Sequence, residues 1–303
     1  MRTAQEGCIL RSLFALVCLS GVAAGSQLAF RSPQDAADAL MAAVESGDYP
    51  KFLEIAGSRM AEFWTTGDPV RDSIERGRLL GAMHQGGIRL TGQSAGLQLL
   101  YVGSLPQPFP APLVKTASGW RFDEDAGVQE LAARRIRRNE VGVVEMCRRF
   151  RDAQLEYQAL GSNGDAAFAA KIRSSPGQRD GLFWSAADDE SPLGPLFAAA
   201  AFAEQDAKEA VRPLFGYYFK ILYGQGADAP GGPLDYRTNG RLVKGFALIA
   251  WPAVYGVDGF RSFLVNQSGD VYQKDLGPGT AAIAEGTSFY NPGSGWIRVP
   301  NYD

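Results

Sequence analysis

Residues 126–159 read AGVQELAARRIRRNEVGVVEMCRRFRDAQLEYQA. Apolar residues recur in this stretch at spacings built from threes and fours, which places them on one stripe of an α-helix. These residues are Ile136, Val143, Cys147, Phe150 and Tyr157. Arginines lie on the other faces of this helix, at 134, 135, 137, 138, 148, 149 and 151. The pattern predicts a long amphipathic helix, and we expect a break or a cap inside it at Asn139-Glu140.

The chain after this helix is rich in β-forming residues. Segment 161–212 is less regular and includes an alanine-rich stretch that predicts a helix over 196–209. Beyond it, runs of β-branched and aromatic residues predict strands. The runs cover residues 217–222, 245–251, 261–266 and 270–273. Asn266-Gln267-Ser268-Gly269 has the composition of a hairpin connection, so we expect an antiparallel sheet here.

The chain before the helix predicts three helices followed by a sheet. Ser32 is suited to cap a helix that has Pro33 in its first turn, and Ser46-Gly47-Asp48 is suited to end it. A second helix is expected to stop at Gly57, and a third to run through Leu79-Leu80. Four alternating segments separated by turns then predict strands at 88–90, 97–102, 111–115 and 119–122. The Pro-rich stretch 105–110 is either a rigid connector or a ligand for a partner.

This first half resembles the NTF2-like (cystatin-like) α+β fold over about residues 30–125. The resemblance rests on three helices, a curved sheet and the closing strand Gly119-Trp120-Arg121-Phe122. It implies an open cone that either holds a small ligand or is filled by core side chains.

Three segments of the second half resemble a family of secreted bacterial proteins, the domain of unknown function 2950 family. They are NEVGVVEMCRRFRDAQLEYQ (139–158), GYYFKI (216–221) and FALIAWPAVYGVDGFRSFLVNQSGDVYQKDLG (246–277). The resemblance extends from Phe30 to about Ala281.

The second half also resembles the soluble heads of pilins and pseudopilins. The matching positions are Asn139-Glu140, Ala153-Gln154, Tyr157-Gln158, Gly216-Tyr217-Tyr218-Phe219, Ala250-Trp251-Pro252, Arg261-Ser262-Phe263 and Ser268-Gly269. Pilins place a long apolar helix before the head, whereas residues 30–138 here predict a soluble domain. The resemblance therefore implies the fold of the head and not assembly into a fibre.

The first residues have the pattern of a secretion signal. Arg2 and Arg11 precede SLFALVCLSGVAA (12–24), an apolar run shorter than the roughly 20 residues of a membrane span. Small residues at Val22 and Ala24 favour cleavage before Gly25, and lipoprotein processing at Cys18 is the alternative. We therefore expect a signal peptide at 1–24, an NTF2-like domain at 25–126 and a pilin-head-like domain at 127–303.

The composition limits the chemistry that the chain can perform. A net charge of −3 argues against a nucleic-acid partner. The chain has three cysteines and one histidine, and two of the cysteines lie in the predicted signal. Cys147 and His84 then cannot form a disulfide or a zinc site of the usual kinds. No nucleotide-binding glycine loop occurs, so no cofactor is expected, and no further stretch is apolar enough to span a membrane.

A few residues remain as candidates for function. His84 is a weak catalytic candidate, because no Gly-x-Ser-x-Gly elbow accompanies it. Cys147 lies on the apolar stripe, where a buried structural thiol is expected. Arg134, Arg135, Arg137 and Arg138 could contact an acidic partner or lipid head groups, although nearby glutamates favour a paired, solvated face. The acidic run 188–190 lacks the spacing of a calcium loop.

These observations favour an exported, non-enzymatic envelope protein that binds a protein partner or a small ligand. We expect it in the periplasm or outside the cell, with a lipid anchor at Cys18 as the alternative. Two other functions stay open. One is a periplasmic hydrolase that uses His84 or paired carboxylates, and the other is a carrier that holds a small ligand in the first domain.

Overall fold

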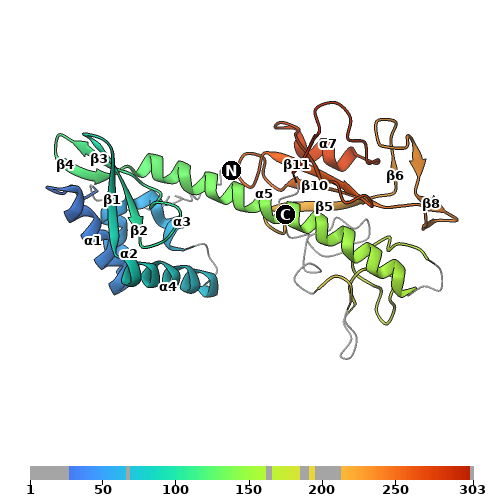
Figure 1. Ribbon diagram of the computed structural model, residues 1–303, viewed down its shortest axis with the longest axis horizontal. Coiled ribbons are helices and arrows are strands. Elements are labelled where there is room, and N and C mark those ends of the chain that lie inside the picture. The colour runs from blue at the N-terminus through green and yellow to red at the C-terminus, as the bar shows by residue number, and fades with distance from the viewer. Residues whose placement is uncertain (1–26, 66–68, 162–165, 185–190, 195–212, 301–303) are drawn as a thin grey trace, which may run out of the picture. The chain divides into compact units, whose positions relative to one another are not determined.

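The computed structural model describes residues 27–65, 69–161, 166–184, 191–194 and 213–300. It confirms the α+β class, with helices and antiparallel sheets along the chain (Figure 1). The chain divides into two compact units, Met1–Val128 and Gln129–Asp303. The predicted signal peptide, the predicted helix over 196–209 and the acidic run 188–190 lie outside the described residues.

The first two helices of the first unit begin and end at the residues that the sequence indicates, whereas the third predicted helix continues past Leu80 to Gly86. Ser32 caps α1 by accepting from the Asp35 amide, and Gly47 ends this helix with a φ of 71°, in the left-handed region. Asp48 caps α2 in the same way. The helical segments are α1 (Pro33–Ser46), α2 (Tyr49–Ala56), η1 (Ser58–Met60), α3 (Ala61–Trp64) and α4 (Pro69–Gly86).

The sheet of the first unit is an antiparallel meander in the order β1-β2-β3-β4. Its strands are β1 (Ile88–Ser94), β2 (Leu97–Val102), β3 (Leu113–Thr116) and β4 (Gly119–Phe122). Phe109 is buried, and its ring lies 4.8 Å from that of Phe63 and 5.3 Å from that of Phe122. The stretch 105–110 therefore connects two strands and contributes a core side chain. The likeness to NTF2-like domains stays a prediction.

One helix, α5 (Glu124–Leu160), links the two units in sequence. The break expected at Asn139-Glu140 is wrong, because α5 is continuous through both residues. Their side chains bond to a loop of the second unit instead of to the helix backbone. Asn139 donates to the Asp258 carbonyl, and Glu140 accepts from the Phe260 and Arg261 amides. Polar side chains that interrupt helices do so by capturing nearby backbone groups, which these two do not do.

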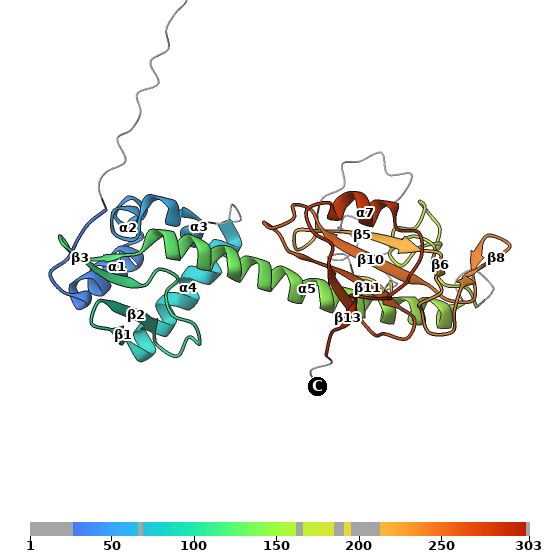
Figure 2. The ribbon, with the colours of Figure 1, turned by 90° about the horizontal axis from the view of Figure 1, so that it is seen from above.

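The second unit is built on a five-stranded antiparallel sheet in the order β13-β12-β11-β10-β5, which Figure 2 shows from above. Its strands are β5 (Tyr217–Leu222), β10 (Ala247–Pro252), β11 (Arg261–Asn266), β12 (Tyr272–Asp275) and β13 (Ile297–Arg298). Two short pairs flank it, β6 (Gly224–Gln225) with β7 (Leu234–Asp235) and β8 (Arg237–Thr238) with β9 (Arg241–Leu242). The last predicted strand begins two residues later than expected, and the Asp270 amide donates to the Ser268 hydroxyl instead of to a neighbouring strand.

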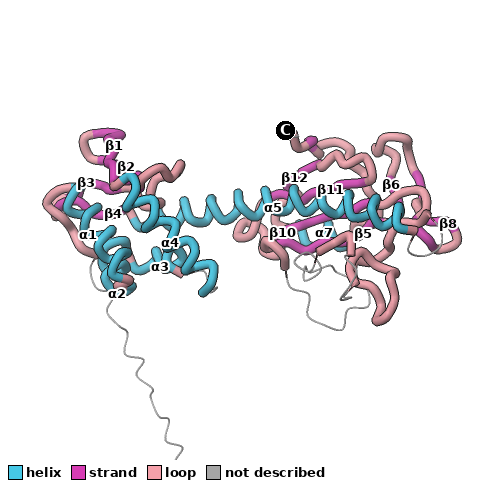
Figure 3. The backbone as a smooth tube through the Cα atoms, turned by 60° about the horizontal axis from the view of Figure 1, so that its bottom comes forward, coloured by secondary structure: helices cyan, strands magenta, loops and turns pink. Residues whose placement is uncertain are grey.

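The core of this unit lies between α5 and the sheet (Figure 3). The predicted apolar stripe is confirmed for Val143, Cys147, Phe150 and Tyr157, which are buried there, whereas Ile136 is half-buried. The short helix α7 (Thr280–Gly286) covers the opposite face (Figure 1). Lys220 on β5 holds the end of α7 by donating to the carbonyls of Ala284 and Glu285. The likeness to pilin heads stays a prediction.

The polar side chains of α5 bind the backbone of irregular segments. Gln154 is fully buried, and its amide donates to the Ala169 carbonyl at 2.8 Å and accepts from the Ala169 amide at 2.9 Å. Further along the helix, Tyr157 donates to the Arg179 carbonyl and Gln158 to that of Ala166. A buried backbone group without a partner is costly, so these bonds hold the segment that follows the helix.

Replacing Gln154 by Ala should lower the free energy of unfolding by about 2–4 kcal/mol, because it leaves both backbone groups of Ala169 buried and unpaired. Gln158→Ala is the control, since Gln158 is half-buried and makes one such bond, which is exposed to solvent. It should cost about 0.5–1 kcal/mol. Urea denaturation measures both values, and equal losses would contradict this role for Gln154.

Candidate functional site

The catalytic candidate His84 lies on the surface near the end of α4. Its side chain is 62% exposed, and Nε2 lies 3.1 Å from Oε1 of Glu45, which is 58% exposed. This carboxylate could orient the imidazole, as a general base requires. The hydrogen bonds of His84 among the described residues include no serine, threonine or cysteine. Within the described part of the chain, the pair supplies an imidazole and an orienting carboxylate without a bonded nucleophile.

Cys147 is fully buried on the apolar stripe of α5. Burial raises the pKa of its thiol to about 12, and the positive charge of Arg148 lowers it only in part. Because the thiolate is the reactive form, this cysteine is protonated and inert at neutral pH. It packs as a small apolar side chain.

The four arginines of the predicted partner surface differ in their contacts. Arg134 is bound to Glu130, one turn earlier on the helix, at 2.7 Å. Arg135 donates through Nε to the Val257 carbonyl at 3.3 Å. Arg137 and Arg138 are exposed. The contacts of the four arginines therefore differ, and Arg135 bonds to the loop that contains Val257.

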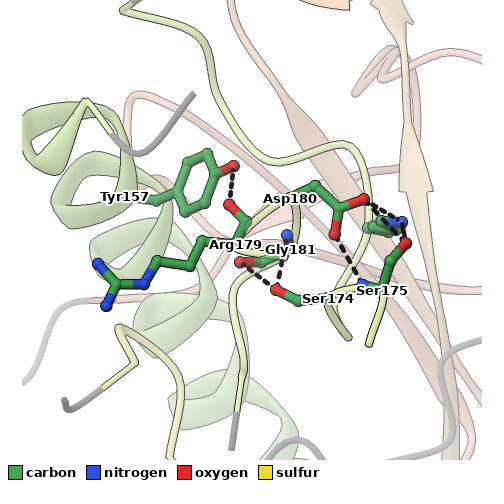
Figure 4. Close-up of polar contacts among 7 residues, drawn as sticks. Tyr157, Ser174, Ser175, Arg179, Asp180 and Gly181 are labelled. Atoms are coloured by element: carbon green, nitrogen blue, oxygen red, sulfur yellow. Dashed lines mark hydrogen bonds and ion pairs between the residues drawn. The ribbon is translucent and has the colours of Figure 1, made fainter. Parts of the chain in front are cut away.

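A hydrogen-bonded cluster of Lys, Ser and Asp side chains lies in the segment after α5 (Figure 4). Ser175 Oγ bonds to Asp180 Oδ2 at 3.0 Å and accepts from Lys171 Nζ at 2.7 Å. Lys171 and Asp180 also form an ion pair at 2.6 Å. Beside them, Ser174 Oγ accepts from the Gly181 amide at 3.0 Å. The cluster joins the two sides of the 171–181 loop.

The same cluster is poorly suited to nucleophilic catalysis. A lysine that activates a serine must accept its proton. Lys171 is instead the ion-pair partner of Asp180 and donates to Ser175. Partial burial favours the neutral acid of Asp180, but hydrogen bonds from Lys171 and Ser175 outweigh it and lower its pKa. We conclude that the cluster stabilises the loop.

A group of exposed apolar side chains lies on two neighbouring loops of the second unit. We call it the apolar surface, and it consists of Phe215, Val254, Val257 and Phe260, which are 38%, 52%, 46% and 43% exposed. The Ala253 amide donates to the Gly216 carbonyl at 2.8 Å, which holds the two loops together. Isolated surface apolar residues are ordinary, whereas several on two joined loops make this surface a candidate for interaction.

The loop that carries most of the apolar surface is held by hydrogen bonds to Glu140 of α5. The Glu140 side chain is 13% exposed, accepts from the Phe260 and Arg261 amides, and forms an ion pair with Arg261 at 3.2 Å. Asp258 Oδ2 accepts from the Val254 amide at 3.0 Å. These bonds hold the backbone of the loop.

Tyr217 supports this loop from within the core. Its hydroxyl donates to the Arg261 carbonyl at 2.9 Å. Burial, reinforced by the carboxylates of Glu140 and Asp258, raises the pKa of Tyr217 well above its ordinary value. Gly259 lies so close to the hydroxyl that any side chain there would overlap it. The phenol is consequently a neutral structural donor.

Phe215 occupies a position where its backbone is strained. Leu214 and Tyr217 exchange both backbone hydrogen bonds, at 3.0 and 2.9 Å, around a two-residue turn. Phe215 and Gly216 have φ values of 51° and 70°, as in a type I′ turn, where Asn-Gly is preferred. A bulky residue there costs about 1–3 kcal/mol. The ring rests over Gly142 of α5, where an added methyl group would come within 3.0 Å of it.

A family model described as a protein of unknown function (DUF2950) matches residues 27–299. The chain belongs to this family. The resemblance of the segments around α5, β5 and β10 to the DUF2950 family is thereby confirmed. Neither a curated protein nor a solved structure matches this DUF2950 chain. Within the described residues, no helix is long and apolar enough to cross a membrane, and no group of three His, Cys, Asp or Glu side chains could hold a metal ion.

Sequence reasoning missed the apolar surface of this DUF2950 chain. Both loops can be located in the sequence. Phe215-Gly216 precedes a strand, and VYGVDGF (254–260) places apolar residues between turn-forming ones. Neither segment indicates exposure, since apolar residues near strands are usually buried. Only the packing of the two loops shows that these side chains point outward.

The Lys171–Asp180 pair should make the stability of the fold depend on pH. The pKa of Asp180 is lower in the folded chain than the unfolded value of about 4, so its stabilisation is present above that value and is lost as pH falls through the folded pKa. Asp180→Asn should therefore lower stability at pH 7 by about 1 kcal/mol, and the difference from the wild type should shrink below about pH 4.

Thermal denaturation followed by circular dichroism across this pH range measures the difference. Asp235→Asn is the control, because Asp235 pairs with Arg237 at an exposed site and its loss should leave the melting temperature nearly unchanged. A destabilisation by Asp180→Asn that is the same at pH 3 and pH 7 would contradict the ion-pair account.

Proposed function

We propose that this DUF2950 protein is an exported, non-enzymatic protein that binds a partner through its apolar surface. The observation that carries the proposal is the strained, exposed Phe215 within a loop pair of fixed geometry. Natural sequences break a local conformational rule chiefly where function requires it. A phenylalanine that strains its turn and stays 38% exposed is best explained by the interaction that it makes with a partner.

Two further features support binding over catalysis. Fixed loops reduce the entropy lost on association, and a small group of aromatic anchors supplies most of the energy of many interfaces. The loops here are fixed by hydrogen bonds with Glu140, Asp258 and Tyr217. The aromatic anchors are Phe215 and Phe260. The predicted signal peptide supports export to the periplasm or beyond.

Replacing Phe215 by Asn should stabilise the fold and weaken binding at the same time. Asn tolerates a positive φ, so we expect a gain of about 0.5–1 kcal/mol, or about 1–4 °C in melting temperature for a chain of this size. Removing the exposed ring should reduce partner capture several-fold. A rise in stability together with a fall in binding separates a binding residue from a structural one, because loss of a structural residue lowers both stability and binding.

Partner capture is measured with a photo-reactive phenylalanine analogue placed at Val257 in the cells that produce the protein. The matched control is the same analogue at Ile283, which is 49% exposed against 46% for Val257 and lies on α7. We expect an adduct at Val257 that Phe215→Asn reduces, and none at Ile283. Equal adducts at both positions, or an adduct that Phe215→Asn leaves unchanged, would contradict the proposal.

The His84–Glu45 pair keeps the hydrolase as a second candidate, because an oriented imidazole is the one element of a general base that the structure supplies. His84→Ala should leave the fold intact, since the pair is exposed. Under the binding proposal, a deletion strain that carries this variant shows the full wild-type phenotype. If the variant is folded and fails to restore the phenotype, the hydrolase replaces the binding protein as the preferred function.

A further inference from the structure

Helix α4 of the first unit packs on its own unit along one side only. Among its described side chains Ala82 is buried, and Leu79 and Met83 are half-buried. Ala82 lies at the end of β2, where a side chain at Gly103 would overlap the Ala82 carbonyl. At about 100° per residue these positions share one side of the helix, so the opposite side faces away from the unit.

The side of α4 that faces away from the unit carries two large apolar residues and two glycines. We call this row the α4 stripe, and it consists of Val70, Ile74, Gly77 and Gly81. Their spacings of four, three and four residues place them along one line of the helix. Val70 is 71% exposed and Ile74 is 64% exposed. Large apolar side chains in a row on the solvent side of a helix indicate an interaction surface.

The two glycines of the α4 stripe have no packing reason within their own unit. A side chain added at Gly77 or at Gly81 would meet nothing within 4 Å. Glycine weakens the interior of a helix more than any other residue except proline. A helix interior keeps glycine where another molecule or segment must approach the backbone closely. Gly77 and Gly81 therefore leave room for side chains that come from outside the unit.

The order of large and small residues makes the α4 stripe complementary to itself. Two copies of α4 that lie antiparallel, around a two-fold axis between positions 75 and 76, bring Val70 of one copy against Gly81 of the other. The same axis brings Ile74 against Gly77. Each large side chain then occupies the space over a glycine, as the packing of ridges into grooves requires. A second copy of the chain therefore fits this surface along its whole length.

The described charges beside the α4 stripe are compatible with contact between two copies. Arg78 borders the stripe, and its Nη1 lies 3.7 Å from Oε2 of Glu75 on the same helix. His84, beyond the last glycine, is paired with Glu45. Each of these basic side chains thus has a carboxylate in its own copy. A bilayer is a poorer occupant, because an interfacial helix needs a broader apolar face than two side chains provide.

We propose that two copies of the chain associate through the α4 stripe, with the two helices antiparallel. An 18-residue helix is about 27 Å long, so one helix pair buries less than the roughly 1,200 Å² of a stable complex. The dimer is therefore reversible and dissociates on dilution. This surface belongs to the first unit and is separate from the apolar surface of the second unit, so the inference adds to the proposed function.

Disulfide trapping tests the alignment of the two helices. It uses the full chain with Cys8→Ser and Cys18→Ser, because the remaining Cys147 is fully buried. The variant Val70→Cys is mixed with the variant Gly81→Cys in the presence of oxidised glutathione. The proposed dimer places the two thiols side by side, and the mixture should form a disulfide-linked dimer. Either variant alone should form none, because its thiols would lie 11 residues apart along the helices, about 16 Å.

The matched control is Ala42→Cys mixed with Gly81→Cys. Ala42 is a small, exposed residue of α1 in the same unit. This mixture should form no linked dimer, since the proposed axis brings Ala42 near no part of the other copy's α4 stripe. A linked dimer here would show that chance collisions account for the disulfides.

Sedimentation velocity measures the association without a crosslink. Gly77→Glu should raise the dissociation constant at least tenfold, because its carboxylate would face Ile74 of the other copy. The melting temperature of the dilute variant should equal or exceed that of the wild type, since Glu is a better helix former than Gly. Ala42→Glu, the matched change on α1, should leave the association unchanged.

Three outcomes would overturn the inference. One is a monomer at every concentration up to about 1 mM, together with no disulfide in the mixture. Another is a linked dimer from Val70→Cys alone, which requires parallel helices. The third is association that Gly77→Glu leaves unchanged, which places the interface elsewhere. None of them affects the proposed function, which the crosslink at Val257 decides separately.

Discussion

The second unit depends on the pairing of backbone groups in segments that belong to no regular sheet or helix. Such groups are costly when buried and unpaired, and here the side chains of α5 provide the partners. Asn139 and Glu140 form hydrogen bonds with the backbone of the loop at 258–261. Arg149 donates to the Pro192 carbonyl, and Gln154 bonds to the backbone of Ala169. One helix thereby fixes several loops while its apolar stripe covers the sheet.

This arrangement explains how an exposed apolar loop keeps one shape. A loop with Val254, Val257 and Phe260 in water would gain by collapsing onto the nearest apolar surface. Glu140 below it and Asp258 within it hold the backbone so that the side chains stay outward. Strain is tolerated at Phe215 for the same reason, because the Leu214–Tyr217 bridge and the contact with Gly142 over-determine the turn.

The polar clusters of the chain resemble catalytic ones in composition and differ from them in geometry. A nucleophilic site can be built from the residue types of Ser175, Lys171 and Asp180. Here, however, Lys171 is paired with Asp180 and donates a hydrogen bond to Ser175, so it does not accept the serine proton. His84 has an orienting carboxylate and no nucleophile among its described bonds. Cys147 is too deeply buried to ionise near neutral pH. Residue types alone thus overstate the chemistry that this chain could perform.

The sequence by itself determined the elements whose signals are local. The apolar stripe of α5, the caps at Ser32 and Gly47 and the β-rich runs of β5, β10 and β11 follow from periodicity and capping chemistry within a few neighbours. The tertiary structure decided the continuity of α5 at Glu140, the contact of His84 with Glu45 and the exposure of Phe215. Each of these depends on groups distant in sequence, and no local pattern records which side chain will face a distant loop or the solvent.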